Sequence, residues 1–440
     1  MATLEQAFSN TKLTENGDIS YSSTGNHLLD ILFMTEYYQN HFNEVTIGNG
    51  DKEKLFAMFI RDPRYGLGRR DLGRYLMLLA GVPFEDVVKA GRFDDVMFFP
   101  GWHEFMANEI LKGNELAKKW APRYSSKNLL LARDFAKYLG MNKQDYGHFV
   151  KAKTVERCLS SKNTGIIQFE HVPSLAMLKY YNRFLTGEDT AKRFEKYLES
   201  VKSGSVKLNI ATTTVYDIYR NRFKIDPDLF FDKIEKIAIN CVPIVDSSGS
   251  MQNANDSYGK AMAIGHYLAK CSTYAPNKVI SFSSQPTLLT LGVENEFVDG
   301  WYGTRVKKQS LAGLNGYKRE IASMHTGDCS NTDFGKVMQL FANVDELPEY
   351  LVVLSDMEFD RGSKMSKDAL RNLWNEKGYT TKIVWWNLNE RNTTAPEIDA
   401  DGNIFMSGYN PMLLKFLEVG FDGEKFLNKL LEEYKKAIEK

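Results

Sequence analysis

The sequence has 440 residues, of which 43% are hydrophobic and 12% aromatic. That is enough apolar material for two or three packed domains, and it excludes long disorder as the dominant state. The 56 basic and 56 acidic side chains cancel, which excludes a uniformly basic nucleic-acid binder and leaves local charge to consider.

The charge is unevenly distributed along the chain. Residues 112–224 contain 22 Lys and Arg against 10 Asp and Glu, whereas the segments before and after are both net negative. A neutral total therefore hides a basic middle segment.

The N-terminus lacks a basic segment followed by an apolar one, and no run approaches the roughly 18 apolar residues of a membrane span. No two cysteines form a CxxC pair; they are Cys158, Cys241, Cys271 and Cys329. We therefore expect a soluble, cytoplasmic protein in a reducing compartment, with no membrane partner.

In chain order, residues 1–50 are polar with little periodicity, and residues 51–225 show helical spacing. Residues 129–139 illustrate this spacing, because one helix face there carries Leu131, Ala132, Phe135, Tyr138 and Leu139. Short breakers such as Gly91 and Pro173 separate segments of helix length. The pattern is typical of a helical bundle or of stacked helix pairs.

Residues 235–425 show a different pattern of apolar residues. Short apolar runs, among them CVPIVD, NKVISFS, YLVVLSD and KIVWWNL, alternate with helical stretches. This alternation predicts a doubly wound, Rossmann-like α/β domain with a mainly parallel sheet. Pro243 lies inside the first run and predicts a bulge or a local irregularity there. Residues 426–440 predict a final helix that packs on the sheet.

Polar residues follow the first of these strands directly. Asp246, Ser248 and Ser250 form an Asp-x-Ser-x-Ser group at the end of the strand and before a helix. Ligands of open α/β sheets bind at this edge, and carboxylate and hydroxyl oxygens suit Mg²⁺ or Mn²⁺. Thr332 and Asp356 follow later in the chain and offer two further oxygen ligands. The alternative is a Ser- and Gly-rich turn in which Asp246 only caps a helix.

This order of residues resembles the metal-ion-dependent adhesion site of von Willebrand factor A domains. The resemblance implies that Ser248, Ser250 and Thr332 provide hydroxyl ligands, and that Asp246 and Asp356 act directly or through water. It also implies that an acidic group of a partner completes the coordination shell of the metal.

A wider resemblance includes the segments FIRDPRYGLGRR, HVPSLAMLKYYNRF, SDMEFD and WWNLN. These resemble the Ro autoantigen family, which combines a TROVE region with a von Willebrand A domain. The resemblance implies HEAT-like helical repeats over about residues 50–215, arranged as a ring that the A domain closes. It also implies that structured small RNA binds outside the ring and that single-stranded ends enter its hole. The helical part is short for a full set of repeats, so the sequence does not decide whether the ring closes.

One stretch of the basic segment mixes cationic and aromatic side chains that suit unpaired RNA. The candidates for RNA contact are Lys143, Tyr146, His148, Lys151, Lys153 and Arg157. The alternative is that the cations line a solvated helix face and that Tyr146 belongs to the core.

The sequence contains no Walker loop, nucleophile elbow or catalytic triad, so we expect no enzyme. The leading hypothesis is an RNA-binding Ro-like protein with a magnesium-dependent site and no expected DNA specificity. The alternative is a scaffold whose metal captures an acidic residue of a partner protein.

Overall fold

The structure is a computed structural model that divides into two compact units. It describes residues 11–13, 19–21, 25–125, 127–152, 154–210, 213–253, 255–282, 286–299, 305–326, 334–341, 344–356, 378, 380–389, 397–398, 404–407, 416 and 422–439. One unit combines residues 1–37 with 213–426, and we call it the sheet unit. The other combines residues 38–212 with 427–440, and we call it the helical unit. The chain therefore passes twice through each unit.

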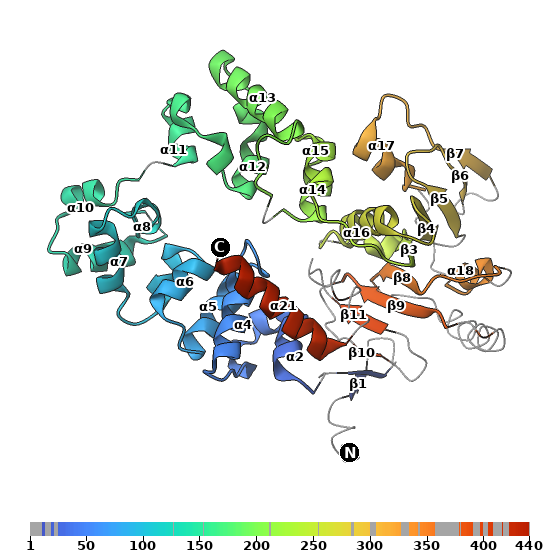
Figure 1. Ribbon diagram of the computed structural model, residues 1–440, viewed down its shortest axis with the longest axis horizontal. Coiled ribbons are helices and arrows are strands. Elements are labelled where there is room, and N and C mark those ends of the chain that lie inside the picture. The colour runs from blue at the N-terminus through green and yellow to red at the C-terminus, as the bar shows by residue number, and fades with distance from the viewer. Residues whose placement is uncertain are drawn as a thin grey trace. The chain divides into compact units, whose positions relative to one another are not determined.

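The described part of the helical unit consists of short helices in sequence, as Figure 1 shows. These helices are α4 (Asp51–Arg61), α5 (Arg70–Leu79), α6 (Phe84–Ala90), α7 (Trp102–Leu111), α8 (Glu115–Trp120), α9 (Leu129–Tyr138), α10 (Lys143–Phe149), α11 (Val155–Ser160), α12 (Ser174–Phe184) and α13 (Glu188–Lys202). Neighbours in sequence pack together, as α4 does with α5 and α12 with α13. Each helix is short, so its stability comes mainly from this packing and not from intrinsic helix propensity.

A buried ionic cluster joins α4, α5 and the 3-10 helix η2 (Phe93–Phe98). Asp95 is fully buried and accepts from Arg61 at 2.6 Å and from Arg74 at 2.5 Å. Gly73 allows α5 to approach α4 closely, because a Cβ at that position would lie 2.6 Å from the Cα of Arg61. The arginines of this region are thus occupied in holding helices together.

The last helix, α21 (Gly423–Ile438), runs from the sheet unit into the helical unit. Within the helical unit the Tyr434 ring packs edge-on against Phe59 of α4, with centroids 5.5 Å apart. The Tyr434 hydroxyl donates to a carboxylate oxygen of Asp62 at 3.3 Å. Our expectation that this helix packs on the sheet is therefore wrong for its C-terminal part. An amphipathic stripe indicates that a helix needs an apolar surface, but it does not indicate which one.

The sheet unit contains a seven-stranded sheet in the order β10-β11-β9-β8-β3-β4-β5. The strands are β3 (Cys241–Asp246), β4 (Lys278–Phe282), β5 (Thr287–Thr290), β8 (Tyr350–Ser355), β9 (Lys382–Asn387), β10 (Glu397–Ile398) and β11 (Ile404–Ser407). The five inner strands are parallel, and β5 and β10 pair antiparallel at the edges. This confirms the predicted mixed architecture of a helical region joined to a mainly parallel sheet. The described residues also form two-stranded sheets from β1 (Thr11–Leu13) with β2 (Ile19–Tyr21), and from β6 (Glu296–Asp299) with β7 (Arg305–Lys308).

Helices cover both faces of the sheet. Val337 and Phe341, in and just after α18 (Phe334–Leu340), join the apolar cluster on the face that carries Ile244 and Val353. On the opposite face lies α16 (Ser257–Cys271), seen over β3 in Figure 1. A Cβ at Gly265 of α16 would lie 2.5 Å from Val245, so glycine permits the close contact of helix and sheet.

Pro243 sits in β3 without a bulge, and the irregularity at this proline is confined to one side of the strand. The register with β8 runs unbroken from Cys241 to Val245, and Pro243 lies opposite Val352. The ladder with β4 begins only at Ile244. On the β4 side, pairing therefore starts after the proline.

The remaining described helices of the sheet unit are α2 (His27–Phe33), α14 (Val215–Asn221), α15 (Pro227–Asp232) and α17 (Gly316–Ser323); α3 (Thr35–Asn40) crosses into the helical unit. We predicted that the helical domain extends to residue 225, but α14 belongs to the sheet unit because it packs on α16. Within α15, Phe231 contacts the rings of His266 and Tyr317.

Candidate functional site

The strand order places the first candidate site where the chain changes direction across the sheet. From β3 the sheet continues to β4 on one side and to β8 on the other. Loops diverge at such a point and leave a crevice at the carboxyl ends of the strands, which is where open α/β sheets bind ligands. Asp246 ends β3, and Asp356 directly follows β8.

Asp246 is completely buried and held by two donors. One carboxylate oxygen accepts the backbone N–H of Ser248 at 2.9 Å. The other accepts the hydroxyl of Ser355 at 2.6 Å. Among the described residues Asp246 has no ion pair, so hydroxyl and amide dipoles alone orient its carboxylate.

Ser248 and Ser250, the two serines predicted as ligands, turn their hydroxyls toward each other. The Oγ atoms of Ser248 and Ser250 lie 3.1 Å apart, in a loop tightened by the 3-10 helix η5 (Gly249–Met251). Ser247 points elsewhere, because its hydroxyl donates to the carbonyl of Phe282 at 3.2 Å. The loop therefore separates two predicted ligands from a structural serine.

Asp356 brings a second buried carboxylate from the neighbouring strand. The pKa of Asp246 is raised to about 6, mainly by burial; the charge of Asp356 contributes to the rise, and the hydrogen bonds from Ser355 and Ser248 oppose it. A cation at this position would offset that electrostatic cost, since it favours the charged carboxylates.

The described residues fit a hard divalent cation, and hydroxyl oxygens would supply part of its coordination shell. Among them, no three His, Cys, Asp or Glu side chains gather into a metal cluster. The structure brings together Asp246, Ser248, Ser250 and Asp356, whereas Thr332 lies outside the described residues. Two carboxylates with two hydroxyls suit Mg²⁺, which retains several waters at sites with few protein ligands. The five-residue ligand set stays a prediction.

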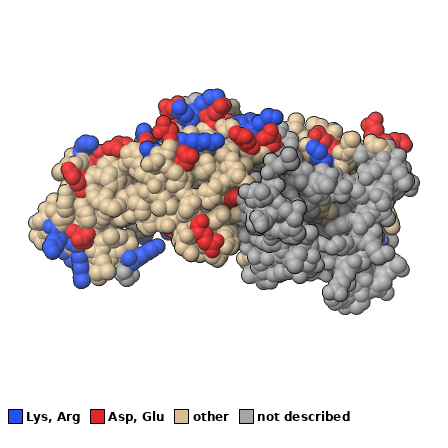
Figure 2. Space-filling model, turned by 90° about the horizontal axis from the view of Figure 1, so that it is seen from below, with Lys and Arg blue, Asp and Glu red and all other residues tan. Residues whose placement is uncertain are grey.

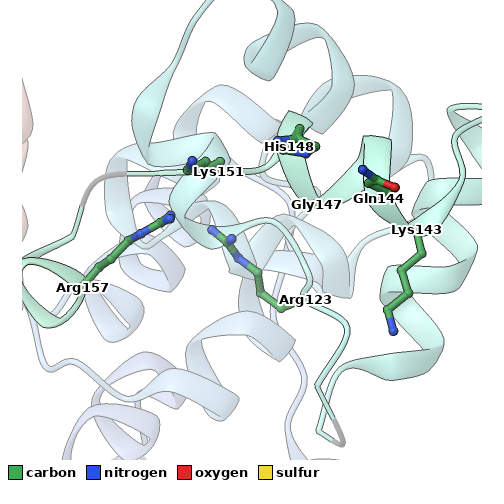
Figure 3. A pocket seen from close by; sticks show the side chains of 7 residues that line it. All are labelled: Arg123, Lys143, Gln144, Gly147, His148, Lys151 and Arg157. Atoms are coloured by element: carbon green, nitrogen blue, oxygen red, sulfur yellow. The ribbon is translucent and has the colours of Figure 1, made fainter. Parts of the chain in front are cut away.

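The second candidate site is a pocket of about 530 Å³ in the helical unit, shown in Figure 3. No acidic residue lines it, and its lining consists of Arg123, Lys143, Gln144, Gly147, His148, Lys151 and Arg157. Four of our six predicted RNA-contacting residues therefore share one pocket. A fifth, Lys153, lies outside the described residues.

Tyr146 does not contribute a stacking surface, which corrects our prediction for this residue. Its side chain is 1% exposed, and its hydroxyl donates to the carbonyl of Pro122 at 2.6 Å. Burial raises the pKa of Tyr146 far above its ordinary value. The ring packs inside the helical unit, where it lies edge-on to the rings of Tyr124 and Phe135 with centroids 5.6 and 6.0 Å away.

Arg123 belongs to the pocket, and sequence reasoning missed it. It lies 20 residues before Lys143 in a loop, and its guanidinium donates to the carbonyl of Lys118 at 3.0 Å. Burial lowers the pKa of Arg123, and the nearby charge of Arg157 lowers it further. The basic composition of residues 112–224 was the one signal that pointed to it. Tyr124, half-buried beside it, has the Lys143 ammonium over its ring, 5.7 Å from the centroid.

Charge is concentrated on parts of the helical unit. Figure 2 shows a face whose middle is largely uncharged, with mainly Lys and Arg side chains at its lower left end and a mixture of basic and acidic side chains along its upper edge. Elsewhere, Arg70 pairs with Asp94, and Lys192 pairs with Glu188 at 2.7 Å. Among the described residues, the four permanently charged side chains of the pocket make no ion pair. The pocket is therefore an uncompensated positive site.

Fold and sites together define a protein in which a unit of short helices is joined to a parallel α/β unit with acidic and hydroxyl groups at its switch point. Residues 240–439 match the model of a domain of unknown function, DUF7788. Residues 149–228 match a second domain of unknown function, DUF2828. The first match covers all strands of the seven-stranded sheet and the final helix, and the second crosses from the helical unit into the sheet unit.

One relative is the uncharacterized protein L728 of Acanthamoeba polyphaga mimivirus, 24% identical over 351 residues. The match covers 68% of this chain, and the chain spans 57% of the length of that relative. Among solved structures, the crystal structure of the Deinococcus radiodurans Ro (RSR) protein is similar with 11% identity and a TM-score of 0.41. That alignment covers 91% of this chain and 93% of the other. At so low a TM-score, the strand order and helix packing described above remain the evidence for the fold.

Among the described residues, no helix is both long enough and apolar enough to cross a bilayer. The described cysteines Cys158, Cys241 and Cys271 are free and buried.

Proposed function

We propose that this chain is an RNA-binding, Ro-like protein whose helical unit holds single-stranded or structured small RNA. The observation that carries this proposal is the pocket on α10 and α11, where cations meet without a carboxylate. Phosphate contacts supply most of the affinity of nonspecific RNA binding, and they require such uncompensated Lys and Arg side chains.

The finer parts of the proposal come from the sequence resemblance. The helical unit would be a HEAT-like TROVE region, and the sheet unit a von Willebrand A domain. The protein would be cytoplasmic and would not be an enzyme. The three free, buried cysteines suit a reducing compartment.

RNA binding is tested by fluorescence anisotropy with a labelled single-stranded RNA over a range of salt concentrations. Each phosphate neutralised on a single strand lowers log affinity by about 0.7 per log unit of salt, so four cations predict a slope near 3. The double variant Lys151→Gln with Arg157→Gln should weaken binding and flatten the slope. Lys196→Gln, an exposed lysine of α13 outside the pocket, is the matched control. Absence of binding at low salt contradicts the proposal.

A second function is supported by the geometry after β3 and β8. We propose that Asp246, Ser248, Ser250 and Asp356, with Thr332, would hold Mg²⁺ or Mn²⁺, and that the cation captures an acidic residue of a protein partner. The paired hydroxyls 3.1 Å apart beside two buried carboxylates support this proposal. Calorimetric titration with each metal tests it, and lack of uptake of both metals contradicts it.

A further inference from the structure

The pocket of the helical unit has features that a binding track for internal RNA linkages does not need. Its four permanent cations come from three separate segments: the loop after α8, the stretch of α10 and its exit, and α11. Figure 3 shows the side chains of Arg123 and Arg157 extending toward each other, with Lys151 beside them. Three cations thus converge on one space, and Lys143, whose ammonium lies over the Tyr124 ring, lines another part of the same pocket.

The elements that carry these charges are held in place. The buried hydroxyl of Tyr146 ties α10 to the loop of Arg123 through Pro122. Asn142 caps α10 by accepting from the backbone of Gln144 at 2.9 Å, and Thr154 caps α11 by accepting from the backbone of Arg157 at 3.2 Å. Acids on the same helices are outside the lining; Asp145, for example, accepts from Asn142 at 2.6 Å. Like charges are therefore kept close on ordered backbone, which favours binding of an anion with several charges.

Charge and size together indicate the ligand. A pocket of about 530 Å³ is within the range of small-molecule sites, so it accommodates about one nucleotide. An internal nucleotide brings one negative charge, and a terminal phosphate brings about −1.5 to −2 near neutral pH with three acceptor oxygens. Within the space of one nucleotide, several phosphates in a chain match the pocket's cations better than a single internal phosphate does.

Gly147 provides an independent observation. It lies within α10 with ordinary helical backbone, and a Cβ at this position would meet no atom within 4 Å. Neither backbone conformation nor packing therefore requires glycine, although glycine is unfavourable inside a helix. The missing side chain leaves the helix surface open in the lining of the pocket, where a ligand approaches the backbone.

We propose that this pocket binds the 5′-terminal polyphosphate of an RNA, an inference that rests on the proposed RNA-binding function. Arg123, Lys143, Lys151 and Arg157 contact the phosphates, and Gly147 allows the phosphate chain to lie against α10. Arginine is suited to this role because its planar guanidinium binds phosphate oxygens in pairs.

The test measures the affinity of one RNA sequence with a 5′-triphosphate, a 5′-monophosphate or a 5′-hydroxyl end. Measurements are made in EDTA, so that metal bound at the sheet unit does not contribute. Charge-assisted contacts to the extra phosphates predict at least about tenfold tighter binding of the triphosphate than of the hydroxyl RNA, with the monophosphate between them. Free ATP is the fourth ligand, and it should compete with triphosphate RNA only at higher concentration.

Two variants separate this proposal from general RNA binding. Arg157→Gln should remove most of the preference for the triphosphate, whereas Lys196→Gln, the same change of charge outside the pocket, should leave the preference unchanged. A Cβ at Gly147 meets no neighbour, so we expect the fold to tolerate Gly147→Leu, whose side chain occupies the lining of the pocket, while the preference is lost.

Each outcome has one interpretation. Equal affinity for the three RNA ends overturns the inference but leaves RNA binding intact. Competition by ATP at lower concentration than triphosphate RNA itself, lost in Arg157→Gln, assigns the pocket to a free nucleotide and also overturns it. Failure of every RNA to bind contradicts the proposed function itself.

Discussion

Two aspartates with no exposed surface show how differently the two units treat a buried charge. In the helical unit, Asp95 is paired with two arginines at 2.6 and 2.5 Å. In the sheet unit, the hydrogen-bond donors to Asp246 among the described residues are serine hydroxyls and a backbone N–H, none of them charged. The first arrangement is complete in itself and joins helices. The second leaves a negative site at the edge of the sheet, where burial raises the pKa to about 6. Burial alone therefore does not identify a functional carboxylate, whereas the nature of its partners does.

Removing the charge of Asp95 should produce the largest effect, because it takes from the buried Arg61 its ion pair and leaves Arg74 only its longer pairs with Asp94 and Asp71. We expect Asp95→Asn to destabilise the helical unit by about 3–5 kcal/mol. Chemical denaturation monitored by circular dichroism measures this. Glu188→Gln is the control, since the exposed pair with Lys192 contributes about 0.5 kcal/mol. Equal effects of the two substitutions would show that the cluster is not structural.

The second effect concerns the sheet unit and pH. Burial lowers the pKa of His325 to about 4 from an ordinary value of 6.5, and Arg222 adds to this. The unfolded chain therefore binds a proton that the folded chain rejects, and stability should fall as pH decreases from about 6.5 to 4. The full difference corresponds to about 3 kcal/mol. His325→Gln should remove this dependence, and the exposed His148→Gln should not.

Asp246 acts in the opposite direction over part of this range, because its raised pKa favours the folded state as pH falls. Asp246 is present in the wild type and in the His325→Gln variant. The difference between their stability profiles therefore gives the contribution of His325 alone. Parallel pH profiles of the two proteins would contradict the prediction.

The third effect tests the metal proposal. If the sheet unit binds Mg²⁺, a hundredfold excess over Kd should stabilise it by about 2.7 kcal/mol. Ser250→Ala and Asp246→Asn should reduce this gain. Ser247→Ala is the matched control, because that hydroxyl donates to Phe282 and faces away from the other two serines. A similar gain in all variants would place the metal elsewhere, and thermal unfolding with and without Mg²⁺ measures it.

The smallest effect addresses the boundary between the units. Tyr434→Phe removes one hydrogen bond to Asp62 and keeps the ring contact with Phe59. We expect a loss of about 1 kcal/mol in the helical unit and none in the sheet unit. Unfolding measured by hydrogen exchange distinguishes the two units, and a loss confined to the sheet unit would contradict the assignment of this helix.

Much of the sheet could be predicted because buried parallel strands are continuous apolar runs. The runs around Ile244, Ile280 and Val352 became β3, β4 and β8, and Asp246 and Asp356 became the ends of two adjacent strands. The helical pattern was less complete. In α9, Ala132 and Phe135 are buried as expected, but Tyr138 is 53% exposed and its ring contacts that of His103. A short helix has too few turns for its sequence to define both edges of its buried face.

By itself, the sequence determined the local features: helical or strand period, the polar loop after β3 and the excess of cations over residues 112–224. These depend on neighbours a few positions apart. Only the tertiary structure decided that Arg123 joins Arg157, that Tyr146 turns into the core and that Tyr434 packs on Phe59. Contacts between distant segments depend on which surfaces fit together, and one amphipathic stripe or one basic helix is compatible with many partners.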